Sequence, residues 1–163
     1  PARTGGLIMT TLISGASYKA FILGKSVERA AALQPQTAQA AIFTVSGGKV
    51  LVTSLIGEVV AATPATTNTL KVTGNPTSGT DVDWTSATST ASKEAGAVLS
   101  LAATAGGALV VANAGAGNAI APTGYVAQVG TIDLVTSGSA ATGTIKWTLT
   151  YVPLDAGATV AAA

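Results

Sequence analysis

Two carboxylates stand two residues apart in Asp81-Val82-Asp83, inside a stretch where polar and apolar residues alternate. Because residues two apart on a strand point to the same face, both carboxylates could offer oxygen ligands to a divalent cation such as calcium. The loop that would complete an EF-hand is absent from this stretch. We therefore expect a pair of surface carboxylates and no bound metal, with a divalent cation as the open alternative.

Two glycine-containing stretches share part of a nucleotide-binding motif without completing it. Gly24-Lys25-Ser26 has the ending of a phosphate loop, but Lys19 occupies the position where that motif needs its first glycine. Gly115 and Gly117 have the spacing that opens a dinucleotide fingerprint, yet the third glycine is missing and no βαβ pattern surrounds them. We expect no phosphate loop at Gly24, an ordinary loop at Gly115 to Gly117, and no nucleotide cofactor.

The sequence contains no Cys and no His. This excludes disulfides, metal sites built on thiolate or imidazole, and catalytic dyads that use His as the base. Ser and Thr are plentiful, but a hydroxyl nucleophile needs an adjacent base and a site for the oxyanion, and the sequence shows neither. We expect a protein that is not an enzyme and that needs no cofactor.

Charged residues make up 9% of the 163 residues, against ~25% in an ordinary soluble domain. A chain with so few charges is expected to have much of its surface covered by other subunits. Residues 1–49 carry five basic and one acidic residue, a net +4, whereas residues 50–163 carry three basic and six acidic residues, a net −3. Scattered positive charges among apolar residues do not make a nucleic-acid surface, so we expect no nucleic-acid partner and a solvated or partner-facing arm instead.

Residues 94–133 contain no charge between Glu94 and Asp133, which raises the question of a membrane span. The best apolar window, residues 97–112, is broken by polar residues and glycines and falls short of the ~20 apolar residues that a spanning helix needs. We expect no membrane partner, and two short strands at residues 98–102 and 108–111 joined by a turn.

The stretch over residues 42–62 is the richest in β-branched residues. Ser46-Gly47-Gly48 is a turn signal, so we predict that its two halves form a hairpin, with a bulge or bend at Gly57-Glu58. A further short strand is expected at residues 69–73 with Leu70 and Val72 on one face, followed by a turn at residues 74–76.

The alternation is strongest at the end of the chain, where residues 125–135 and 142–152 each predict one strand. The second of these places Ile145, Trp147, Leu149 and Tyr151 on one face. Trp84 and Trp147 are both expected to be core or interface anchors, because each stands at an apolar position of the alternation.

These patterns predict an all-β protein, an antiparallel β-sandwich or barrel, with a jelly-roll-like arrangement among the alternatives, and with an extended N-terminal arm. We expect the arm over residues 1–37, with about two turns of helix at residues 27–33. The sandwich is expected over residues 38–155 and a flexible tail over residues 156–163.

Four stretches resemble small virion structural proteins of tailed bacteriophages, of the type that decorate or cement the capsid. They are Leu33-Gln34-Pro35-Gln36-Thr37, residues 47–58, Gly130-Thr131-Ile132-Asp133-Leu134 and residues 146–154. The resemblance implies a β-rich protein on the outer surface of the capsid of a virion, bound to the major capsid protein, often as a homotrimer. It carries over no functional residues, because such proteins act through surfaces.

Two alternatives remain open, a tail or fibre component and a carbohydrate-binding sandwich module that uses Trp84 or Trp147 with the acidic pair. For the leading interpretation we expect partner contacts from the basic and apolar residues of the arm. These candidate partner-binding residues are Arg3, Leu7, Ile8, Leu12, Lys19, Phe21, Lys25 and Arg29.

Overall fold

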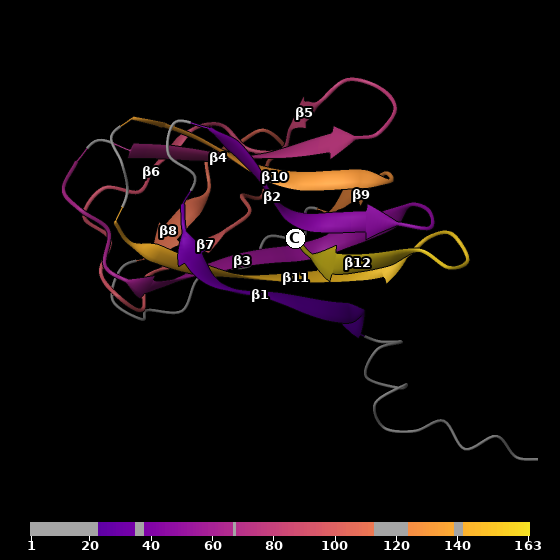
Figure 1. Ribbon diagram of the computed structural model, residues 1–163, viewed down its shortest axis with the longest axis horizontal. Coiled ribbons are helices and arrows are strands. Elements are labelled where there is room, and N and C mark those ends of the chain that lie inside the picture. Colours follow the sequence, from indigo (N-terminus) through magenta and orange to yellow (C-terminus); the bar gives the residue numbers. More distant parts are fainter. Residues whose placement is uncertain (1–22, 35–37, 67, 113–123, 139–141) are drawn as a thin grey trace, which may run out of the picture.

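The computed structural model describes residues 23–34, 38–66, 68–112, 124–138 and 142–163, and these form two antiparallel sheets packed as a sandwich (Figure 1). The all-β prediction is therefore confirmed, and of the alternatives it included, the sandwich is the one that the structure has. No strand of the described part runs alone, because each pairs with at least one neighbour in its sheet.

Sheet A has the strand order β1-β11-β3-β7-β8, and β9 also pairs with β3. Its strands are β1 (Lys25–Leu33), β3 (Val50–Ala61), β7 (Val98–Ser100), β8 (Val110–Ala112), β9 (Tyr125–Ala127) and β11 (Thr144–Pro153).

Sheet B has the order β12-β2-β10-β4-β5, and β6 also pairs with β4. Its strands are β2 (Gln39–Ser46), β4 (Asn68–Pro76), β5 (Val82–Asp83), β6 (Thr88–Ser89), β10 (Gly130–Gly138) and β12 (Thr159–Ala162).

The core lies between the two sheets and is built by strands that alternate buried and half-exposed residues. In β11 the buried positions are the predicted ones, Ile145, Trp147, Leu149 and Tyr151. Sheet B contributes Leu70 and Val72 from β4, also as predicted, together with side chains from β2 and β10. β11 and β10 are each flanked on both sides by long strands, and their inward faces are buried.

The predicted hairpin over residues 42–62 is wrong, because its two halves lie in different sheets. β2 pairs with β10 and β12, whereas β3 pairs with β11, and the chain crosses the sandwich at Gly47 and Gly48. Both glycines have positive φ angles that other residues resist. The Asp155 carboxylate accepts a hydrogen bond from the Lys49 backbone N–H at 2.8 Å, which holds the crossing against the next turn.

The predicted interruption at Gly57-Glu58 is also wrong. The register of β3 with β11 is continuous there, and the irregularities lie elsewhere, between Thr144 and Ile145 and between Thr150 and Tyr151.

The two ends of the described chain contribute strands where the sequence predicted a helix and a tail. Residues 27–33 belong to β1, which pairs with β11, so the helix prediction is wrong and the expected arm does not extend to residue 37. In the expected tail, β12 pairs with β2 and buries Val160, whose backbone N–H donates to the Tyr151 hydroxyl at 3.2 Å. Neither alanine-rich segment gives a local signal for a strand, and both are ordered by pairing with distant parts of the chain.

Two other local predictions are wrong because pairing with distant strands determines where these strands begin and end. Residues 125–135 form two strands rather than one, because the chain leaves sheet A after β9 and enters sheet B at Gly130. The turn expected at residues 74–76 lies inside β4, which continues to Pro76 opposite Gly130.

The expected pair of strands near residues 98–111 is present as β7 and β8, which pair with each other. The described part of the chain has no helix able to cross a membrane.

Candidate functional site

Most candidate partner-binding residues of the N-terminal segment lie outside the described residues. These are Arg3, Leu7, Ile8, Leu12, Lys19 and Phe21. The remaining two, Lys25 and Arg29, lie in β1 at the edge of sheet A.

Arg29 has a structural contact that the sequence did not suggest. It stands opposite Trp147 in the register of β1 with β11, and its Nε donates a hydrogen bond to the Ala163 backbone oxygen at 3.2 Å. This bond links β1, at the edge of sheet A, to the residue that follows β12 of sheet B. Lys25 begins β1 opposite Tyr151 and is exposed. Arg29 therefore helps to close the sandwich edge, and Lys25 is the one of the two that is open to a partner.

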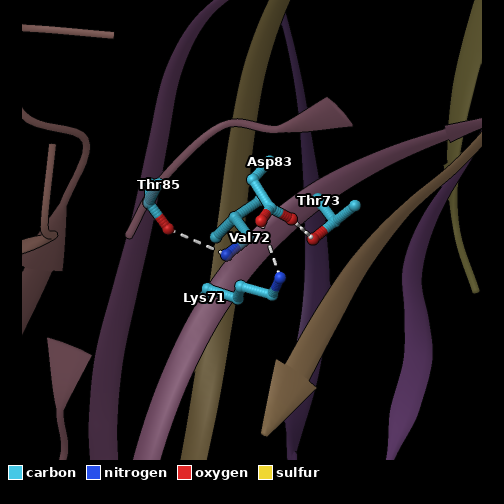
Figure 2. Close-up of polar contacts among 5 residues, drawn as sticks. All are labelled: Lys71, Val72, Thr73, Asp83 and Thr85. Carbon is cyan, nitrogen blue, oxygen red and sulfur yellow. Dashed lines mark hydrogen bonds and ion pairs between the residues drawn. The ribbon is translucent and has the colours of Figure 1, made fainter. Parts of the chain in front are cut away.

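Asp81 and Asp83 do not bind a common partner. Asp83 accepts hydrogen bonds from Lys71 Nζ at 2.6 Å and from Thr73 Oγ1 at 2.9 Å, across the β4–β5 pairing (Figure 2). The bond from Lys71, followed by that from Thr73, holds the pKa of Asp83 below its usual value. Asp81 is exposed just before β5 and shares neither contact. Within the ranges that the structure describes, no three His, Cys, Asp or Glu side chains gather closely enough to hold a metal ion.

A hydrogen bond behind this ion pair fixes the segment that carries Asp83. The Thr85 hydroxyl accepts from the Val72 backbone N–H at 2.9 Å (Figure 2). The Trp84 backbone N–H donates to the Val72 carbonyl, also at 2.9 Å. Because Thr85 and Trp84 are both buried, the short strand β5 is anchored at its end and Asp83 is held over β4.

Asp133 is a buried carboxylate that sequence reasoning missed as a site residue. It lies on β10 and only 3% of it is exposed. Its Oδ2 accepts from Gln39 Nε2 at 2.7 Å and from Asn75 Nδ2 at 3.1 Å, while Oδ1 has no hydrogen-bond partner among the described residues. The signal in the sequence was its place between Ile132 and Leu134, on the opposite face of a strand whose other face is core. These amides come from β2 and β4, so Asp133 joins the three long strands of sheet B.

Both tryptophans are core residues, as predicted. Trp84 is 4% and Trp147 1% exposed, so neither offers a ring face on which a sugar could stack. The Trp84 ring is stacked on Tyr125 with centroids 4.8 Å apart, and the Tyr125 hydroxyl donates to the Trp84 carbonyl at 2.6 Å. A pocket of about 100 Å³ lies beside Trp84 and is lined entirely by uncharged residues, among them Asn75, Val82, Val126 and Gln128.

A second ion cluster lies on the outside of sheet A. Lys146 on β11 is 2.8 Å from Glu58 on β3 and 3.8 Å from Glu28 on β1, measured from Nζ to Oε2. The hydrogen bond with Glu58, with the charges of both carboxylates, raises the pKa of Lys146 above its usual value. The cluster links three adjacent strands and has a net charge of −1.

Comparisons with protein-family models, with curated proteins and with solved structures find no match for this chain.

Proposed function

We propose that the chain is a structural protein of a bacteriophage virion that binds the outer surface of the capsid and stabilises it. The observation that supports an assembled state is the surface of the sandwich, which exposes large aliphatic side chains although the core is closed. Those at least 38% exposed are Leu23, Leu33, Val60, Val82, Val110, Val126, Val129, Val152 and Leu154. A chain with 9% charged residues that exposes this much aliphatic surface suits a subunit covered by neighbours.

The virion assignment is supported by the resemblance of the four stretches to capsid decoration proteins of tailed bacteriophages. Three of these stretches coincide with elements of the sandwich. Residues 47–58 span the β2–β3 connection and most of β3, residues 130–134 lie in β10, and residues 146–154 cover most of β11. In this proposal the partners are the major capsid protein and other copies of the chain, with a trimer favoured. No single side chain acts alone, because many weak contacts of a symmetric assembly together stabilise the shell.

The segment before Leu23 is the proposed capsid-binding arm. It contains the aliphatic run over residues 7–13 together with Arg3 and Lys19. Burial of five or six large aliphatic side chains at ~1.5 to 3 kcal/mol each would determine affinity, whereas exposed ion pairs would add only ~0 to 1 kcal/mol apiece. Charge would mainly change the encounter rate and its salt dependence.

Deletion of residues 1–22 tests the arm, because β1 and all its pairing with β11 remain in the truncated chain. We expect the truncated protein to keep the thermal melt of the full chain and to bind purified capsids with at least tenfold lower affinity. Saturation of the capsids with unchanged affinity would show that the arm is dispensable.

The proposal as a whole is tested by electron cryo-microscopy of the virions that carry the chain and of particles lacking its gene. We expect density for the sandwich on the outside of the capsid, lost in the deletion particles. Density on the tail or fibres alone would instead support the tail component, and the absence of the chain from particles would overturn a virion role. Glycan binding by the isolated protein without capsid binding would support the carbohydrate module.

A further inference from the structure

The outward faces of the two sheets differ in chemistry. On sheet B the outward side chains form a polar network in which Asp133, Asp83 and Lys71 are bonded to amides, hydroxyls and each other. On the strands of sheet A, the side opposite Trp147 has only three charged residues, Glu28, Glu58 and Lys146, and the rest is aliphatic or hydroxylated. An antiparallel sheet in water normally has a polar outer face, so the outer face of sheet A stands out.

A row of aliphatic side chains crosses this face near one end. Leu51 on β3 stands directly opposite Val126 on β9 and Val152 on β11. Val126 is 57% and Val152 38% exposed, and Leu51 is half-buried between them. Three neighbouring aliphatic side chains facing outward in one row gain free energy when another apolar surface covers them.

The charges on the face lie away from this row. Lys146 and its two carboxylates carry a net charge of −1, and Lys146 is six residues along β11 from Val152. Around it are hydroxyl groups, for example those of Thr148 and Thr150 on β11 and Ser54 on β3. Hydroxyls can donate to and accept from an identical face, which ammonium or carboxylate groups alone cannot do.

The size of the face fits a modest interface. Five strands about 4.8 Å apart, averaging roughly seven residues of ~3.3 Å, give a projected area on the order of 600 Å². Two such faces in contact would bury about 1,200 Å² in total, at the lower limit of specific protein interfaces. An association of this size is expected to be reversible and to depend on concentration.

We propose that the outer face of sheet A is a self-association surface, on which a second copy of the chain packs sheet against sheet through the row Leu51, Val126 and Val152. A second copy is favoured as the occupant because two such faces in contact bury enough area for a reversible dimer, and two sheets of this kind can pack with strands about 30° apart. The contact is isologous, so it joins two copies, each contributing the same row, and it is additional to the contacts of the trimer favoured above. The inference rests on the proposed function only for the expectation that copies assemble.

The test is sedimentation of the isolated full chain, without capsids, across roughly micromolar to submillimolar concentration. We expect reversible association that weakens at least tenfold in Val126→Lys and in Val152→Lys, because each places an ammonium group in the apolar row. The matched control is Val135→Lys, which makes the same change on β10 and on the outer side of sheet B, and which should associate like the unaltered chain. Thermal melts of all three variants verify folding.

A chain without cysteine allows a second measurement that does not depend on these variants. A single cysteine in Thr148→Cys, near the centre of the face, should be cross-linked between copies by a short bifunctional thiol reagent, whereas Thr44→Cys on β2 should not. A monomer at every concentration, equal cross-linking of both variants, or equal weakening by all three lysine substitutions would overturn the proposal. A monomeric chain that still decorates capsids would overturn this inference alone and leave the capsid proposal intact.

Discussion

Gly57 and Trp147 stand directly opposite each other in the register of β3 with β11, and the indole fills the space that a side chain at residue 57 would take. A Cβ atom added to Gly57 would lie 2.9 Å from the Cη2 and Cζ3 atoms of the ring. Both residues are buried. Glycine is thus required at residue 57 because an aromatic ring approaches the backbone closely, although the register is continuous there and the φ angle of Gly57 is not positive.

Substitution Gly57→Ala should destabilise the protein by about 1 to 3 kcal/mol, because the buried ring has to shift to admit the new methyl group. Chemical denaturation measures the loss. The control is Val60→Ala on the same strand, where the side chain is 48% exposed and the expected change is within about 0.5 kcal/mol. Equal stability of Gly57→Ala and the unaltered chain would show that the ring does not depend on this space.

Substitution Trp147→Ala should cost about 3 to 5 kcal/mol, because it opens a cavity in the centre of sheet A's inner face. In the double variant Gly57→Ala with Trp147→Ala, the cost of the alanine at residue 57 should largely vanish, since the ring it meets is gone. A double-mutant cycle measures this coupling. Additive losses would contradict the contact described for the pair.

The ion pair of Asp83 with Lys71 should give a small pH-dependent contribution to stability. Because the folded pKa of Asp83 lies below its value in the unfolded chain, the contribution is present above the unfolded pKa of ~3.9 and is lost as the pH falls through the folded pKa. The pair is partly exposed, so we expect only ~0 to 1 kcal/mol at neutral pH and less in high salt.

The comparison of Asp83→Asn with Asp81→Asn isolates this contribution, since only Asp83 contacts Lys71 and Thr73. The Asp83 variant should lose stability at pH 7 and match the unaltered chain near pH 2, and Asp81→Asn should change little. Carboxyl NMR titration should place the pKa of Asp83 higher in Lys71→Ala than in the unaltered chain.

Removal of divalent cations should leave the protein unchanged. The Asp83 carboxylate is already bonded to Lys71 and Thr73, and Asp81 does not join it. We expect the same Tm with EDTA, with added calcium and with neither. A clear fall in Tm with EDTA that calcium reverses would contradict the assignment of Asp81 and Asp83 as surface carboxylates.

Deletion of residues 159–163 should destabilise the sandwich by about 2 kcal/mol or more, because it exposes the surface that Val160 covers and leaves the edge of β2 unpaired. A thermal melt of the truncated chain measures this. The reference variant is Ala163→Gly, at the exposed residue after β12, which should melt as the unaltered chain does. An unchanged Tm after the deletion would support the flexible tail that the sequence suggested.

Side-chain alternation predicted which residues face the core, and it did so wherever a strand is long. The inward positions of β11 and β4 were predicted correctly, because a period of two is a property of the strand itself. Alternation does not say which sheet a strand joins. The turn at Gly47 and Gly48 can serve a hairpin or a crossing between sheets, and only the pairing of β2 with β10 distinguishes the two.

The candidate site was less predictable than the core. Asp83 was singled out for its neighbour Asp81, whereas its actual partners Lys71 and Thr73 lie on β4. The place of Asp133 between two core residues was its only signal, and it did not reveal the binding partners, since the amides that bind it come from β2 and β4, 94 and 58 residues away in the sequence. Arg29 was expected in an arm and instead bonds the Ala163 backbone oxygen.

The crossings of the sandwich also determine when the protein can fold. Strands β1 to β4 alternate between the sheets, as do β9 to β12. β1 can therefore pair only after β11 has been synthesised, and β2 only after β10 and β12. Such distant pairings make folding slow, because the chain closes large loops before it gains contacts. On the ribosome the first strands emerge with unpaired edges and remain exposed to aggregation until nearly the whole chain has been synthesised. A chaperone that shields these edges during translation would therefore raise the yield of folded protein.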